Sequence, residues 1–220
     1  ARLRLAPRTL PGAAPWRHFR EGVLEVGRDR LVLVVSGAQA AQFVLNGMMN
    51  AFLPLYAREI VGLSLPQLGW LFGLQTLTTL AIRPGIGLLS DRVGRRWIIS
   101  CGLGVCATAV LLIPVANGLA SLLGVIMLYA AGVATTTAAT SALITDVTRR
   151  ARYGAAHGVF GTLYDVGDAL GPITAGLLVA AFGYARMFHS MGLFVLAMAV
   201  GVTVASHRIE RLRLSDPRAR

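Results

Sequence analysis

Residues 87–96 read Gly-Leu-Leu-Ser-Asp-Arg-Val-Gly-Arg-Arg, and they decide how the rest of the chain is interpreted. The stretch lies between two apolar runs, so it predicts a helix end, a turn that glycine permits, and a cationic cluster with one carboxylate, Asp91. That carboxylate can neutralise an arginine or accept hydrogen bonds from the N–H groups at the start of a neighbouring helix. The pattern indicates a loop between membrane spans that can hold helices together.

Apolar runs continue outward from this loop in both directions. The chain has 220 residues, of which 14% are charged and 55% hydrophobic, whereas soluble domains carry about 25% charged residues. A bilayer core is crossed by roughly 20 apolar residues, and six such runs are predicted: 31–57, 66–89, 97–116, 119–144, 154–182 and 187–206. The composition excludes a soluble domain and predicts an all-α membrane protein with six transmembrane helices.

The positive charge of the chain marks topology rather than a nucleic-acid partner. All 21 basic residues are arginines, and the formal net charge is +11. The arginines do not gather on one face of a soluble domain, as in nucleic-acid-binding proteins. Instead, 18 of them lie before the first run, in the second and fourth breaks, and after the last run. The positive-inside rule therefore predicts cytoplasmic termini, with residues 1–30 and 207–220 as basic tails around a bundle at 31–206.

The loop resembles, position by position, the G-x-L-S-D-R-x-G-R-R signature of the major facilitator superfamily, which lies between the second and third helices of each six-helix half. The resemblance implies a transporter of a small molecule in the cytoplasmic membrane, without enzymatic activity or cofactor. It assigns a cytoplasmic gate to six residues of the loop: Gly87, Asp91, Arg92, Gly94, Arg95 and Arg96.

Two further patterns agree with this resemblance. Gly87-Leu88-Leu89 and Gly94 recur 89 positions later as Gly176-Leu177-Leu178 and Gly183, as a three-plus-three inverted repeat would require. A run of small residues in the fifth span resembles the glycine-proline helix signature of the family's antiporters and departs by one residue from its usual spacing. Its members are Gly167, Gly171, Pro172 and Gly176.

The fourth run indicates which half of a transporter the chain would be. In proton-coupled members of the family, the fourth helix of the N-terminal half usually carries an arginine, and the run 119–144 has no charged residue. Residues 1–30 are also similar to the central cytoplasmic loop that joins the two halves. The resemblance thus implies a C-terminal half, with the N-terminal six-helix half, or a second half, as its partner.

Polar side chains inside the spans are the candidates for substrate contact. Gln39, Gln42, Asn46 and Asn50 fall within a sector of about 80° on the first helix. This stripe predicts a cavity wall, although interhelical hydrogen bonds worth about 0.6 kcal/mol each are the alternative. Tyr129 in the fourth span is a further candidate, because its ring can stack and its hydroxyl can hydrogen-bond.

Two aspartates near the middle of the fifth span are the candidates for proton coupling. A carboxylate in the membrane interior is costly unless it is paired, hydrated or protonated. Asp165 and Asp168 lie one turn apart and could carry a proton. The alternative is a structural network in which Arg83 or neighbouring hydroxyl groups hold one of them.

We therefore predict a secondary transporter that works by alternating access, as a proton-coupled exporter. The competing interpretation is a six-span scaffold without transport, or an inactive truncated half. The sequence shows no metal-ligand spacing, nucleophile elbow or phosphate-binding loop, so no metal or catalytic residue is predicted.

Overall fold

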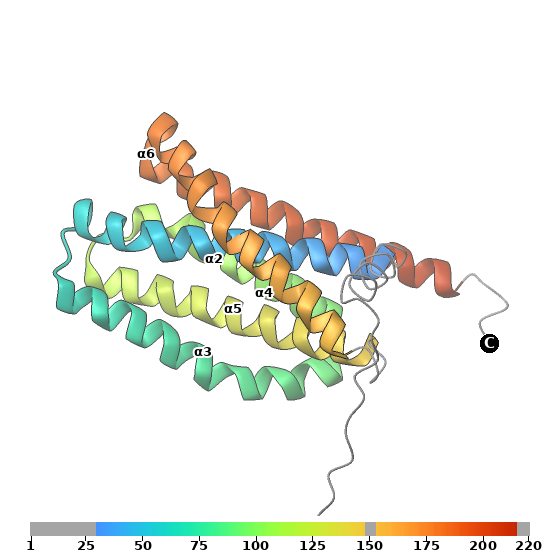
Figure 1. The fold of residues 1–220 in the computed structure, drawn as a ribbon. Helices are drawn as coiled ribbons and strands as arrows, with labels where there is room; N and C mark the ends of the chain where they lie inside the picture. Colours follow the sequence, from blue (N-terminus) through green and yellow to red (C-terminus); the bar gives the residue numbers. More distant parts are fainter. Residues whose placement is uncertain (1–29, 148–152, 215–220) are drawn as a thin grey trace, which may run out of the picture.

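The computed structural model describes residues 30–147 and 153–214, and every regular element in these segments is helical (Figure 1). The elements are α2 (Arg30–Glu59), α3 (Leu65–Val93), α4 (Arg95–Leu112), a short 3-10 turn η1 (Ile113–Val115), α5 (Leu119–Val147) and α6 (Tyr153–Leu214). The predicted apolar runs coincide with these helices, because each run must satisfy its own backbone hydrogen bonds. The all-helical prediction is confirmed for the described residues.

Helix α6 holds the last two predicted spans. Gly183 has φ 80° and ψ 172°, which are not helical angles, and divides α6 into two arms. A straight helix of 62 residues would be about 93 Å long, three times the thickness of a bilayer core. Figure 1 shows the chain reversing here, so that the second arm returns beside α2. The arms correspond to the predicted runs 154–182 and 187–206.

In the described part of the chain, three helical segments are long and apolar enough to cross a membrane: Arg95–Val115, Leu119–Leu143 and Tyr164–Ala205. The last is 42 residues long and includes the reversal at Gly183. The predicted spans 31–57 and 66–89 do not reach this level of apolarity in the described residues. Both contain amide side chains, and the second contains Arg83, so the residues that suggest function also weaken the apolar signal.

The helix ends alternate between two sides of the bundle. In Figure 1 the start of α2, the turn between α3 and α4, the end of α5 and both ends of α6 lie on one side, which we call the loop end. The α2–α3 connection, η1 and Gly183 lie on the other side, the far end. The signature loop, residues 87–96, is therefore on the same side as both described chain ends, as the distribution of arginines predicts.

Glycines allow two pairs of helices to touch through their backbones. At the crossing of α2 with the first arm of α6, a Cβ on Gly47 would lie 2.1 Å from the carbonyl oxygen of Asp168, and one on Gly171 would lie 2.3 Å from that of Val44. At the crossing of α4 with α5, a Cβ on Gly132 would lie 2.7 Å from the backbone nitrogen of Cys106. Small residues bring membrane helices this close where van der Waals packing drives association.

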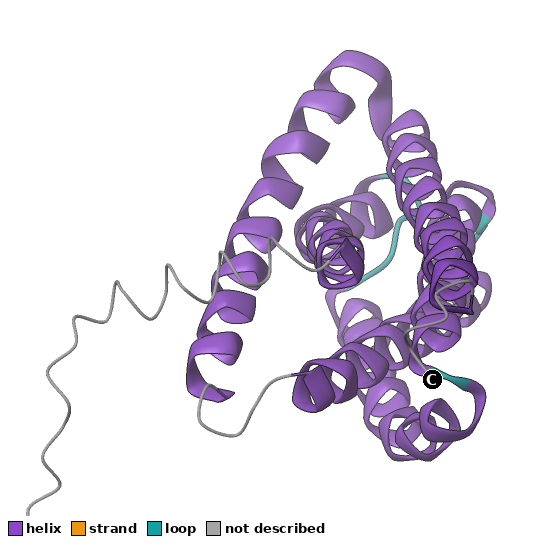
Figure 2. Cartoon of the chain, turned by 90° about the vertical axis from the view of Figure 1, so that its right-hand side faces the viewer, coloured by secondary structure: helices purple, strands orange, loops and turns teal. Residues whose placement is uncertain are grey.

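The two arms of α6 cover different parts of the bundle. Figure 2, which views the molecule nearly along the helices, shows the first arm running obliquely across the bundle and the second arm more nearly parallel to the other helices. Helix α6 packs on α2 and α4, and α5 packs on α3 and α4. The fully buried side chains include Leu45, Leu103, Ile126 and Phe188, one from each of α2, α4, α5 and α6. The polar residues described next lie among these packed helices.

Candidate functional site

The signature loop is a tight turn between α3 and α4. Gly94 alone separates the two helices and has φ 101°, a conformation that favours glycine. Its N–H donates to the carbonyl of Ser90 at 3.1 Å, and the Ser90 hydroxyl donates to the carbonyl of Gly87 at 2.9 Å. The glycines of the signature thus permit a reversal in which the backbone bonds to itself.

Arg95 connects this turn to a third helix. Its Nη2 forms an ion pair with Asp91 Oδ1 at 3.1 Å, and its Nη1 donates to the carbonyl of Ala142 near the end of α5. The Arg95 side chain is 20% exposed, whereas that of Asp91 is 61% exposed. Arg92 is also exposed and Arg96 is half-buried. Among the predicted gate residues, Arg95 is therefore the one that joins α3, α4 and α5.

The polar stripe of α2 changes its surroundings along the helix. Gln39 and Gln42, nearer the loop end, are buried, Asn46 is half-buried, and Asn50 is exposed. In the described part of the chain, the stripe is closed toward the signature loop and open in the middle of the bundle. Among the described residues of the stripe, Asn46 and Asn50 are the two whose side chains are not buried.

The two aspartates of α6 have different surroundings. Asp168 is half-buried, and its Oδ1 accepts a hydrogen bond of 3.2 Å from Asn46 Nδ2 on α2. Asp165, one turn earlier, is exposed. Arg83 is exposed on α3 and forms no ion pair with either of them in the described part of the chain. The structure thus brings together Asn46 and Asp168, which the sequence placed in separate groups, the cavity wall and the proton carriers.

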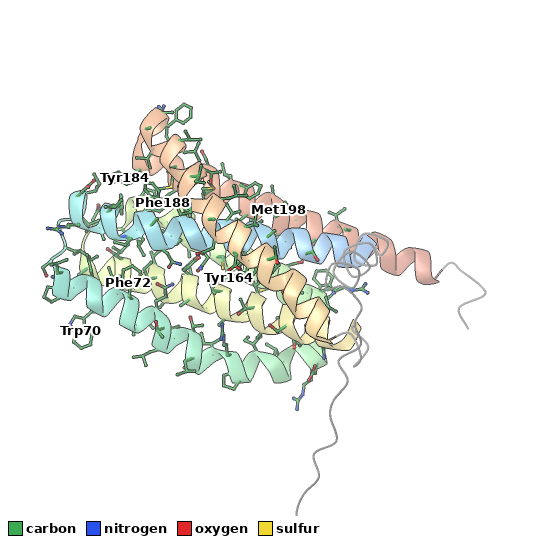
Figure 3. The ribbon with its side chains drawn as sticks, viewed as in Figure 1. Trp70, Phe72, Tyr164, Tyr184, Phe188 and Met198 are labelled. Carbon is green, nitrogen blue, oxygen red and sulfur yellow. The ribbon has the colours of Figure 1, made fainter. Side chains whose placement is uncertain are left out.

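The contact between Asn46 and Asp168 depends on the glycine signature of α6. Gly167 faces the side chain of Phe43, and Gly171 meets the α2 backbone beside Gly47. Tyr164 lies on the same arm, with its ring 4.5 Å from that of Phe43 (Figure 3). The other two members of the signature are not at the close crossing: Gly176 makes only an ordinary contact with Phe52, and Pro172 lies within the helix.

Several polar atoms inside the bundle have no hydrogen-bond partner. The Tyr129 side chain is fully buried in α5, and its hydroxyl is unpartnered. The other unpartnered atoms among the described residues are Ser36 Oγ, Gln39 Oε1, Gln42 Oε1, Gln75 Oε1 and Thr140 Oγ1. Ser36 and Gln75 stand isolated in their apolar runs and carry no signal in the sequence. Thr140 lies at helical spacing from Tyr129 and is expected from the sequence to bond back to its own helix backbone, but its Oγ1 has no partner.

The far end carries a second polar contact between α2 and α6. Glu59 Oε2 accepts a hydrogen bond of 2.8 Å from the hydroxyl of Tyr184, which lies in the turn beside Gly183. Partial burial raises the pKa of Tyr184 above 10.0, and the hydrogen bond to Glu59 and the negative charge of Glu59 raise it further. The Tyr184 ring also lies 5.8 Å from that of Tyr56, and Phe188 packs against Tyr56 at 5.2 Å (Figure 3). Neither Glu59 nor Tyr184 was a predicted site residue.

We expect Tyr184→Phe to weaken this contact without unfolding the bundle, at a cost of about 1 kcal/mol for one exposed hydrogen bond. Because the folded pKa of Tyr184 is raised, its contribution is complete below pH 10.0 and is lost as the pH rises through the folded pKa. Tyrosinate absorbance is followed against pH for the wild type and the variant. The wild-type curve should contain one tyrosine that titrates above pH 10.0 and that is missing from the curve of the variant. A difference that titrates below pH 10.0 would contradict the contact.

The geometry has the parts of a membrane carrier: a charged turn that can lock helices, a carboxylate at a close helix crossing, and polar atoms inside the bundle. No group of three potential metal ligands occurs among the described residues. The sequence profile of the major facilitator superfamily matches residues 35–218, most of the chain. The chain belongs to the major facilitator superfamily. It is thus a member of a family of transporters, not of enzymes, and the resemblance of the signature loop is confirmed.

Individual relatives agree with this membership. The chain is 26% identical to an uncharacterised MFS-type transporter of Methanocaldococcus jannaschii, over 76% of this chain and 42% of the relative. It is 28% identical to the fosmidomycin resistance protein of Escherichia coli, over 77% of this chain and 41% of the relative. It is 26% identical to the multidrug resistance protein MdtG of Escherichia coli, over 78% and 43%. The chain thus spans less than half the length of these relatives.

Proposed function

We propose that this chain is the C-terminal six-helix half of a major facilitator transporter that exports a small molecule across the cytoplasmic membrane by alternating access, coupled to protons. The observation that carries the proposal is the bridge from Arg95 to Asp91 and to the Ala142 carbonyl, which ties α3, α4 and α5 at the loop end. The direction of transport is supported by relatives named for resistance to drugs.

The bridge gives the signature loop a physical role as a gate. Hydrogen bonds to charged groups are worth about 1.5–3 kcal/mol each, and about 1.4 kcal/mol changes an equilibrium tenfold. A bridge of this free energy can strongly favour the transporter state in which the loop end is closed. It can still break when a substrate or proton binds the open state better. Alternating access needs such a balance.

Coupling to protons is assigned to Asp168, with Asp165 in a secondary role. Asp168 lies where α2 and α6 touch, and its carboxylate accepts a hydrogen bond from Asn46. Protonation changes what that carboxylate can accept or donate, so a proton alters the contact between the two helices. Asp165 is exposed and lies one turn away from that contact, so its role is secondary.

The remaining parts of the proposal concern the membrane and the partner. Both termini face the cytoplasm, since the described chain ends lie on the side of the signature loop and the arginines of the sequence follow the positive-inside rule. The substrate site lies where this half meets the N-terminal half, with Asn46 and Asn50 lining it. A non-transporting scaffold or inactive half is the alternative that the following experiment tests.

Arg95→Ala in the full-length protein is the test of the proposed gate. A thermal-shift screen on the purified protein identifies a transported compound, and uptake into everted vesicles with an imposed pH gradient measures transport. We expect Arg95→Ala to lower the transport rate about tenfold or more, because the bridge to α5 is lost. The matched control is Arg92→Ala, since Arg92 is exposed in the same turn.

The alternatives give different results in this assay. If no compound is accumulated by the wild type under any gradient, the chain is a scaffold or an inactive half. If Arg95→Ala and Arg92→Ala transport at equal rates, the chain transports but the Arg95 bridge is not its gate.

A further inference from the structure

Five buried polar atoms without partners follow two neighbouring helices. They are Ser36 Oγ, Gln39 Oε1 and Gln42 Oε1 on α2, and Tyr129 Oη and Thr140 Oγ1 on α5. Each residue is at least nine-tenths buried, with Tyr129 at 0% and Gln42 at 1% exposure. We call these five residues the polar seam.

The members of the seam lie at matching depths in the bundle. At 1.5 Å per residue, Gln39 is about 30 Å from the far end of α2, and Thr140 is about 32 Å from the far end of α5. By the same measure Asn46 and Tyr129 are about 20 Å and 15 Å from the far end. Helices α2 and α5 are in contact, so the two rows lie on neighbouring helices over an overlapping range of depths.

The seam connects the two features to which the proposed function assigns a role. At one end, Thr140 is two residues from Ala142, whose carbonyl is bound by Arg95 of the signature loop. At the other end, Asn46 is one turn from Gln42 and donates to Asp168. The Tyr129 hydroxyl also interacts electrostatically with the Asp168 carboxylate. The titratable groups near Asp168 in the described residues are Tyr129 on α5 and Tyr164 and Asp165, each one turn away on its own helix, while the α2 side chain that contacts it is the neutral amide of Asn46.

The chemistry of the seam fits water and not an organic substrate. An unpartnered buried polar group costs about 1–3 kcal/mol, and buried water commonly satisfies such groups with two to four hydrogen bonds each. The two amide oxygens accept hydrogen bonds, whereas the hydroxyls of Ser36, Tyr129 and Thr140 both donate and accept. A water molecule can donate a hydrogen bond to the amide oxygens, and it can donate to or accept from the hydroxyls. The burial of the seam leaves no route for a larger ligand.

We propose that the polar seam holds a chain of water molecules that carries protons between the loop end and Asp168, inside this half and apart from the substrate cavity. Each water accepts a proton from one neighbour and passes another on. The Asp168 carboxylate ends the chain as a neutral carboxylic acid, so charge and atoms balance without a redox partner. The proposal rests on the proposed proton coupling, and it adds a separate path for the proton.

Radiolytic hydroxyl-radical labelling of the full-length protein in lipid nanodiscs tests for water in the seam. Radicals form from water beside the side chain that they modify, so a buried aromatic residue is labelled only where water lies next to it. Tyr129 and Phe188 are both 0% exposed, but only Tyr129 carries an unpartnered polar atom. We expect labelling of Tyr129 and none of Phe188. Equal protection of both rings would overturn the proposal.

A variant pair tests continuity of the seam. We expect Gln42→Leu to abolish labelling of Tyr129 and to remove the acceleration of transport by a pH gradient. The thermal midpoint should not fall, because the variant removes an unpartnered buried amide. Asn50→Leu changes an exposed amide on the same helix and should leave the labelling of Tyr129 unchanged. Labelling that survives Gln42→Leu would overturn the continuous path.

Failure of this proposal is distinguishable from failure of the proposed function. If Asp168→Asn loses proton coupling while Tyr129 stays as protected as Phe188, the coupling stands and the water path is wrong. If Tyr129 is labelled and neither Asp168→Asn nor Gln42→Leu changes coupling, the seam holds water but carries no proton, and both the path and the assignment of Asp168 are wrong.

Discussion

Gly47→Ala is expected to abolish the folded bundle, as is Gly171→Ala on the opposing helix. The added methyl group at position 47 would lie 2.1 Å from the carbonyl oxygen of Asp168, and the one at position 171 would lie 2.6 Å from the backbone nitrogen of Met48. Both obstacles are backbone atoms, which cannot move aside as a side chain can. Overpacking costs about 1–3 kcal/mol where side chains can yield, and more is expected where they cannot.

Yield of monodisperse protein by size-exclusion chromatography, together with the thermal midpoint in detergent, measures this effect. Gly37→Ala is the matched control on α2, and Gly73→Ala on α3, since a Cβ at either position meets no atom within 4 Å. Alanine favours helix over glycine by about 1 kcal/mol, so the controls should be as stable as the wild type or more so. Normal folding of both Gly47→Ala and Gly171→Ala would show that α2 and α6 do not cross here.

The second large effect is expected from Asp168→Asn, which should lose the dependence of transport on a pH gradient. Asparagine has the same shape as aspartate and can still accept the hydrogen bond from Asn46, so the crossing of α2 and α6 should remain intact. It cannot take up a proton. Uptake into proteoliposomes driven by a pH gradient should therefore be lost, while exchange of labelled for unlabelled substrate continues.

Asp165→Asn is the comparison for this experiment, because Asp165 lies one turn away on the same helix but is exposed. We expect its effect on the pH dependence to be much smaller than that of Asp168→Asn. Unchanged dependence on the pH gradient in both variants would remove the two aspartates from the mechanism. Loss of exchange in Asp168→Asn would mean that the variant disturbs the substrate path rather than the coupling.

The helices were predictable from the sequence because each apolar run has to satisfy its own backbone in the membrane. The run 66–89 predicts α3 (Leu65–Val93) to within a few residues, and Gly94 marks the turn that follows. The repeat offset also has a structural counterpart, since Gly94 and Gly183, which are 89 positions apart, both have positive φ at a chain reversal. The three-plus-three inverted repeat itself stays a prediction.

The candidate site was predictable as a set of residue types but not as a set of contacts. The sequence singled out Asp165 and Asp168 as a pair, yet the tilt and rotation of α6 give them different surroundings. It also grouped Tyr129 with the substrate cavity, whereas the Tyr129 side chain is fully buried among the described helices. Helical periodicity places residues on one face, but the face that is covered depends on the neighbouring helix.

The sequence by itself determined the membrane character of the chain, the helices and the signature loop, since these follow from local hydropathy, glycine conformation and residue spacing. Only the tertiary structure decided that Asn46 meets Asp168, that Arg95 reaches α5 and that five polar atoms of α2 and α5 are buried without partners. These contacts join residues up to 122 positions apart. They depend on how closely α2 and α6 approach at Gly47 and Gly171, and helix crossings of that kind are fixed by packing rather than by local sequence.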